Sequence, residues 1–185
     1  VDEKGWGYAT RNALFRFGVD LKVSGLENVP LEGSNLYLVN HPWGVLEGFA
    51  LMAGLDDYLA SHGKGFRIMG NIRLGAVKGL GQKLIAVDLD GKAGGLGINY
   101  QGFREMFKMI KRKEDLVVLP AGSPYTFRNW KIGEEDWKES VGELIPKFDN
   151  VIPMKFNGTK NGFLYSLTAI VCPSARGAFY FREAC

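Results

Sequence analysis

Residues 36–48 read LYLVNHPWGVLEG, and the class of fold can be inferred from them. The first four residues form a continuous apolar run, which is typical of a strand that is buried on both faces. Pro42 and Gly44 then predict a turn, and the residues from 46 to 59 repeat apolar side chains at helical spacing. A buried strand that leads through a turn into a helix is the repeating unit of an α/β fold.

The same alternation continues on both sides of this stretch. Short apolar runs predict strands at residues 21–24, 35–39, 66–69, 83–87, 116–119, 151–156 and 164–171. Helical periodicity predicts helices at 46–59, 98–113 and 134–148. Residues 20–185 are therefore expected to form a single layered α/β domain, with a mostly parallel or mixed sheet flanked by helices.

The helix expected at 98–113 has two notable clusters of side chains. Apolar side chains lie three or four residues apart on one face, at Tyr100, Phe103, Phe107 and Ile110. Its last part is basic, with Lys108, Lys111, Arg112 and Lys113. Cations of this kind complement the carbonyl end of a helix, and this explanation is favoured over a phosphate-binding site.

Residues 1–19 are expected to form a separate N-terminal segment. Between Gly5 and Gly18 it combines large aromatic side chains with Arg11 and Arg16. As a helix it would be amphipathic with a basic edge, which suits the interface between a membrane and water. A terminal helix docked on the body of the protein fits the same pattern equally well.

The composition excludes several classes of protein. The 185 residues are 46% hydrophobic and 23% charged, which is ordinary for a folded domain and excludes a disordered chain. A net charge of +3 does not favour a dedicated nucleic-acid-binding protein. No apolar stretch reaches the roughly 18 residues of a membrane-spanning helix. The two histidines and two cysteines are widely scattered, so no metal site is expected.

His41 is the first candidate for chemistry because it follows a buried strand directly. In open α/β sheets, ligands bind at the carboxyl ends of the strands. Glu47 cannot face His41 within one regular helix, but the turn at Pro42 and Gly44 can bring it back. A carboxylate at one ring nitrogen leaves the other free to act as a base towards an alcohol that attacks an acyl carbon. On spacing alone, a structural histidine beside an unrelated glutamate is the alternative.

Several segments resemble, in the right order, the signatures of one family. Residues 40–48 resemble the first signature of the glycerolipid acyltransferases, the 1-acylglycerol-3-phosphate acyltransferase-like proteins. They are closest to the hemolysin-like and lyso-ornithine-lipid acyltransferase branch, whose signature is Asn-His-Pro-x-Gly-x-x-Asp-Gly. This chain has the spacing of that branch, with Glu47 in place of the Asp. Residues 119–123 resemble the third signature and residues 151–158 the fourth, while residues 66–71 lie where the second is expected. The resemblance spans about residues 20–160, so it implies an acyltransferase-like domain.

This resemblance implies a reaction and a site. His41 would be the general base and Glu47 its orienting partner. The hydroxyl of a lyso-lipid would attack an acyl thioester, carried by coenzyme A or acyl carrier protein, without an acyl-enzyme and without a metal or organic cofactor. A protein of this kind would be peripheral to a membrane, on the cytoplasmic side or in an organelle. The implied substrate-binding residues are Asn40, Gly44, Arg67, Pro120, Gly122, Ser123, Arg128 and Pro153.

The third signature departs from the family pattern. Ser123, Pro124 and Tyr125 follow Gly122, where the family has residues that hold the polar head of the acceptor. An amino-lipid or another lyso-lipid is therefore as plausible an acceptor as a glycerol phosphate. The departure also motivates a second hypothesis, in which the protein is a catalytically silent member of the fold that serves as a lipid-binding or structural subunit of a larger assembly.

Overall fold

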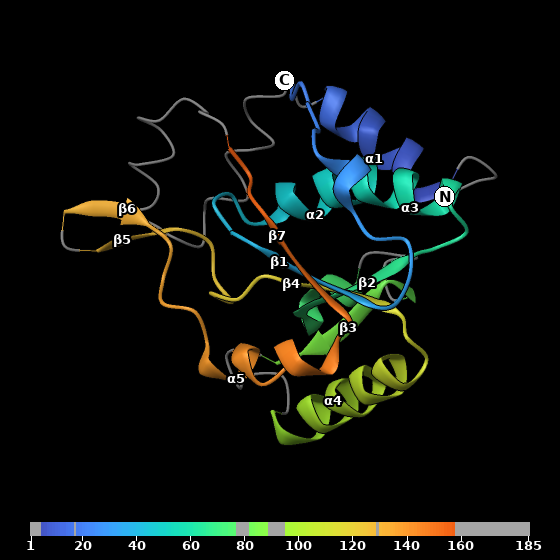
Figure 1. Ribbon diagram of the computed structural model, residues 1–185. Helices are drawn as coiled ribbons and strands as arrows, with labels where there is room; N and C mark the ends of the chain where they lie inside the picture. Colours follow the sequence, from blue (N-terminus) through green and yellow to red (C-terminus); the bar gives the residue numbers. More distant parts are fainter. Residues whose placement is uncertain (1–4, 17, 77–81, 89–94, 129, 158–185) are drawn as a thin grey trace.

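A five-stranded parallel sheet forms the centre of the molecule in the computed structural model (Figure 1). The structure describes residues 5–16, 18–76, 82–88, 95–128 and 130–157. The strands are β1 (Asn35–Val39), β2 (Phe66–Asn71), β3 (Leu84–Val87), β4 (Asp115–Val118) and β7 (Asn150–Met154), in the spatial order β3-β2-β4-β1-β7. The α/β class is confirmed, and every strand pair of this sheet is parallel.

The register of the central strands places two loops side by side. Leu38, near the end of β1, pairs with Val118 at the end of β4 and with Pro153 in β7. The loops after β1 and β4 therefore leave the sheet at the same level of its carboxyl edge. This is the edge where an open parallel sheet binds its ligands.

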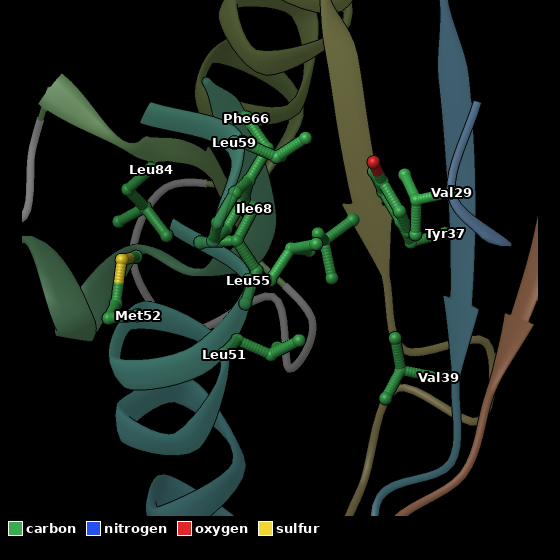
Figure 2. Packing of buried hydrophobic residues seen from close by; sticks show 11 residues of the cluster. Val29, Tyr37, Val39, Leu51, Met52, Leu55, Leu59, Phe66, Ile68 and Leu84 are labelled. Carbon is green, nitrogen blue, oxygen red and sulfur yellow. The ribbon is translucent and has the colours of Figure 1, made fainter. Parts of the chain in front are cut away.

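Helices cover both faces of the sheet. On one side lie α2 (Val45–Leu51), a π-helical segment (Met52–Asp56) and α3 (Asp57–Ser61); α4 (Leu96–Lys111) and the short α5 (Glu139–Gly142) lie on the other (Figure 1). Figure 2 shows the first of the two resulting cores, where side chains from residues 51–59 lie against β1, β2 and β3. The second core is formed by Leu36, Leu38, Ile85, Met106, Met109, Leu116, Val118, Val141, Leu144 and Phe148.

The N-terminal helix α1 (Gly5–Arg16) packs on α2 as an outer layer (Figure 1). Leu14 is 1% exposed and lies in a cluster with Leu46, Ala50 and Ala53. Arg11 donates a hydrogen bond to the carbonyl oxygen of Ala53. A terminal helix docked on the body is therefore what the structure contains. Within the described residues, no helix has both the length and the apolar character needed to cross a bilayer.

A closed polar network fixes the amino edge of the sheet. The fully buried Asp115 carboxylate accepts hydrogen bonds from the backbone and side chain of Asn35, at 3.0 and 2.8 Å, and from the Tyr37 hydroxyl at 3.1 Å. Lys64 Nζ lies 3.2 Å from the same carboxylate. Burial and the neighbouring Asp115 charge raise the pKa of the Tyr37 hydroxyl.

Asp149 ties β7 to the start of β1 at the same edge. Its carboxylate accepts hydrogen bonds from the backbone and the hydroxyl of Ser34, both at 2.8 Å, and from Lys113 at 2.7 Å. These donors, Lys113 first, hold the pKa of the Asp149 carboxyl well below its usual range.

Several predicted elements differ from the observed ones. Residues 21–24 were expected to form a strand, which is wrong: this stretch is not paired, and Val23 packs against Gly54 of the π-helical segment. The helix expected at 134–148 is reduced to α5 and a 3₁₀ turn at Ile145–Lys147, where Pro146 cannot continue an α-helix. A hairpin of β5 (Thr126–Arg128) and β6 (Lys131–Gly133) was not predicted. The strand expected at 164–171 lies outside the described residues.

Candidate active site

His41 lies directly beyond the carboxyl end of β1, and its backbone is held on both sides. Its N–H donates to Glu134 Oε1 at 3.1 Å, and its carbonyl accepts from the N–H of Tyr125 at 3.0 Å. The imidazole is 16% exposed and lines a cavity. The loop after β1 is thereby joined to the segment after β4, and the ring is presented at the sheet edge.

Glu47 lies in the first turn of α2 and its side chain is completely buried. Its Oε1 accepts a hydrogen bond from the backbone N–H of Trp43 and lies 3.4 Å from His41 Nδ1. No described residue donates a hydrogen bond to Glu47 Oε2. The structure thus brings the acid and the imidazole together, and the backbone of the turn holds the carboxylate in place.

Gly44 makes this approach possible. Its φ of 91° lies in the region that side chains disfavour, and a Cβ there would meet Pro124 Cγ at 3.3 Å. The chain turns at this residue immediately before α2 begins at Val45. The turn therefore brings Glu47 back towards His41, which a continuous helix would not do.

Asn40 stabilises the loop through its side-chain amide. Its Nδ2 donates to the carbonyl of Phe156 at 3.1 Å and to the Tyr125 hydroxyl at 3.3 Å, and its Oδ1 accepts from the N–H of Phe156 at 2.6 Å. These contacts make Asn40 a clamp between the end of β1 and the segment after β7. The ring of Trp43 packs on Phe156 as well, with centroids 6.0 Å apart.

The loop after β4 forms the other side of the site. Gly122 has a φ of 70° and its N–H donates to the carbonyl of Leu119, which closes a tight turn. The next residue, Ser123, has a buried hydroxyl without a hydrogen-bond partner among the described residues. Pro120 is buried, and its carbonyl accepts from the N–H of Lys138 at 3.0 Å.

A cavity of about 580 Å³ connects these two loops. His41 and Gly44 line it on one side, and Gly122 and Ser123 on the other. Such a volume is in the usual range for a small-molecule site. The interior is mainly apolar, formed by Phe49, Met52, Ile68, Met69, Leu74, Leu84, Val87, Phe103, Val118, Leu119, Val141 and Leu144. It can accommodate a hydrocarbon chain with its reactive end near His41.

Arg67 and Pro153, two of the residues expected to bind substrate, are not among the residues that line the cavity. Arg67 is on the α4 side of β2, where it donates to the carbonyl of Leu84 at 3.1 Å and lies 3.8 Å from Glu105. Pro153 is exposed on β7 and is not among the residues that line the cavity. Arg128 belongs to β5, and its side chain lies outside the described part of the chain.

Lys138 lines the cavity and was missed by the sequence analysis. It is exposed, and its Cε lies close to Gly122, 3.7 Å from where a Cβ would be. No local pattern marks Lys138, which falls in the segment that was predicted to be a helix. Within the described residues, no three His, Cys, Asp or Glu side chains are grouped as metal ligands would be.

No protein-family model matches the chain. The sequence is 28% identical over 155 residues to a lyso-glycine lipid O-acyltransferase of Bacteroides thetaiotaomicron. The aligned region covers 82% of this chain and 53% of that protein. It is 27% identical over 156 residues to a protein of the same name from Phocaeicola vulgatus, which covers 81% and 51%. The chain is a distant relative of lyso-glycine lipid O-acyltransferases. It spans about half the length of these curated relatives.

Proposed function

We propose that this chain carries the catalytic domain of a lyso-lipid O-acyltransferase, with His41 as general base and Glu47 as the group that orients it. The observation that carries the proposal is the 3.4 Å separation between His41 Nδ1 and the completely buried Glu47 carboxylate. His41 Nδ1 makes no hydrogen bond among the described residues, so it is free to donate to the neighbouring carboxylate once substrate binds. A carboxylate that accepts from Nδ1 favours the tautomer in which Nε2 is unprotonated and can accept a proton. The distant similarity to O-acyltransferases supports the same reaction class.

The proposed reaction is a single displacement. Nε2 of His41 takes the proton of the acceptor hydroxyl while that oxygen forms a bond to the thioester carbonyl carbon. The carbon–sulfur bond then breaks, and the departing sulfur receives the proton held on Nε2, which gives the free thiol and restores the neutral imidazole. The donor is an acyl-CoA or an acyl-carrier protein, whose chain the apolar cavity accommodates. Because a thioester is already activated, an oriented base and correct positioning are sufficient.

We assign the acceptor to lyso-lipids with an amino-acid head group. Residues 40–48 resemble the first signature of the lyso-ornithine-lipid branch, with Glu47 in place of its Asp, and both relatives are named for lyso-glycine lipid. A glycine head group attached through its nitrogen would present a carboxylate. Lys138, the cation that lines the cavity beside Gly122, is placed to contact it, and the buried Ser123 hydroxyl has hydrogen-bonding capacity left for the substrate.

The direct test is acyl transfer by purified protein. Labelled acyl-CoA and acyl-carrier protein are each offered with lyso-glycine lipid, lysophosphatidate and a neutral monoacylglycerol. We expect transfer to lyso-glycine lipid that disappears in His41→Ala. Absence of turnover with every pair would favour the catalytically silent, lipid-binding alternative, and transfer that survives the substitution would refute the mechanism.

Lys138→Met tests the acceptor assignment separately. A lost charge-assisted hydrogen bond should raise KM for lyso-glycine lipid roughly tenfold and leave KM for the neutral acceptor unchanged, with Lys138→Arg restoring part of the affinity. Lys147→Met, at an exposed lysine on the 3₁₀ turn, is the matched control. An equal change for both acceptors would contradict the role of Lys138.

A further inference from the structure

The outer face of α4 is unusually aromatic for a surface helix. Tyr100 is 70% exposed, Phe103 45% and Phe107 49%. At about 100° per residue these three side chains fall on one stripe, while the buried face of the helix consists of Gly102, Met106 and Met109. The aromatic periodicity visible in the sequence therefore belongs mainly to the exposed side of the helix.

A basic stripe runs beside the aromatic one. Arg104, Lys108 and Lys111 are exposed, and together with the three aromatic side chains they line a shallow hollow. The Glu105 carboxylate pairs with Lys108 at 2.6 Å, but no ion pair of Arg104 or Lys111 is found within the described residues. The face thus combines apolar rings with uncompensated positive charge, which is the chemistry that binds an anionic lipid surface.

This face is continuous with the cavity that contains His41. Phe103 lines both the hollow on α4 and the cavity. Gly102 lets the helix approach β3 closely, since a Cβ there would lie 2.3 Å from the carbonyl oxygen of Ala86. A bilayer in contact with α4 would therefore lie beside Phe103, which also forms part of the cavity wall.

We propose that the exposed face of α4, formed by Tyr100, Phe103, Arg104, Phe107, Lys108 and Lys111, binds the surface of an anionic bilayer. Binding places the aromatic rings at the level of the head groups, with the cations on lipid phosphates. Delivery of lipid to His41 from this surface rests on the proposed function, whereas vesicle binding does not.

The test is sedimentation with vesicles of phosphatidylcholine alone or of phosphatidylcholine with about 30% phosphatidylglycerol. Each contact between a basic side chain and the anionic lipid is expected to raise the affinity about fivefold. We expect the protein to prefer the anionic vesicles and to be released by salt. Tyr100→Ser with Phe107→Ser should weaken binding about tenfold or more, and Arg104→Gln with Lys111→Gln should remove the preference for anionic vesicles. All four residues are exposed, and circular dichroism checks that the variants are folded.

The matched control changes the other aromatic and basic helix. Phe15 is 81% exposed on α1 and is followed by Arg16, so Phe15→Ser with Arg16→Gln removes the same kinds of group. We expect this variant to bind like the wild type. Loss of binding in the α1 variant but not in the α4 variants would overturn the proposal, as would concentration-dependent dimerisation through α4 without vesicle binding.

The same assay separates this inference from the proposed reaction. His41→Ala should bind vesicles like the wild type, since His41 lies at the sheet edge and not on α4. Vesicle binding that depends on α4, in a protein without acyl transfer activity, would support the membrane-binding face and reject the proposed reaction. Acyl transfer by a protein that binds no vesicles would support the reaction and reject the membrane-binding face.

Discussion

The two edges of the sheet differ in whether their buried polar groups have hydrogen-bond partners. At the amino edge, the Asp115 carboxylate has four polar contacts, from Asn35 twice, Tyr37 and Lys64. At the carboxyl edge, His41 Nδ1, Glu47 Oε2 and the Ser123 hydroxyl are buried, and none has a hydrogen-bond partner among the described residues.

This difference distinguishes structural polar groups from those available to a substrate. A buried polar atom without a partner costs about 1–3 kcal/mol, so three such atoms at one edge of the sheet need an explanation. Ser123 lines the cavity, where a ligand can complete the hydrogen bond of its hydroxyl, whereas His41 Nδ1 lies 3.4 Å from the Glu47 carboxylate. The amino edge holds the strands in register, and the carboxyl edge retains unused hydrogen-bonding capacity where a substrate can meet it.

Replacing His41 with alanine should give the largest effect. Loss of the proposed general base is expected to lower kcat by about 10³-fold, while the free energy of unfolding changes by less than about 1 kcal/mol because His41 Nδ1 makes no hydrogen bond among the described residues. Kinetics and denaturant unfolding measure the two quantities. His62→Ala, at the exposed histidine after α3, should change neither. A large loss of stability in His41→Ala would show that the ring mainly stabilises the fold.

The reciprocal change is Asp115→Asn at the opposite edge. It should lower the free energy of unfolding by about 3 kcal/mol, because the new amide donors face the existing donors and Lys64 loses its counter-charge. Urea denaturation gives this value. Asp20→Asn, at a side chain that is 81% exposed and lies 3.5 Å from Lys22, should be nearly neutral. If both variants behaved alike, the network around Asp115 would have no special role.

Glu47→Gln should separate charge from shape in the candidate active site. Glutamine can still accept the hydrogen bond from the Trp43 N–H, but it lacks the negative charge beside His41 Nδ1. We expect kcat to fall roughly 10- to 100-fold, within the range of a positioned proton transfer, with KM unchanged. Steady-state kinetics provide the readout. Full activity of this variant would show that the carboxylate only supports the turn.

Asp149→Asn should have the smallest effect, and one that depends on pH. The pKa of the Asp149 carboxyl is lowered in the folded state, so this group adds stability above its unfolded value of about 4, and the contribution is lost as the pH falls through the folded pKa. The variant should melt below the wild type at pH 7, and the gap should shrink as the solution becomes acidic. A gap that is independent of pH would exclude the ionised carboxylate as its cause.

The part of the fold that brings His41 and Glu47 together could be predicted because its signals are local. The apolar run of β1, the turn at Pro42 and Gly44, and the helix that follows lie within a few residues of each other. Lys138 could not be found in this way, since it meets the loop after β4 only through the tertiary fold. The spacing in α4 identified which side chains share a face, but not which face is buried. That choice depends on Gly102 and its contact with the backbone of β3.

The π-helical segment Met52–Asp56 determines how α2 is rotated relative to α3. A wide turn of this kind holds an extra residue compared with a regular α-helix, and all five of its residues are buried. Deleting one residue there would rotate α2 by about 100° relative to α3, so the two helices could no longer both bury their present faces. One wide turn, which begins five residues after Glu47, thus sets how the helix that carries this acid is oriented relative to the next helix.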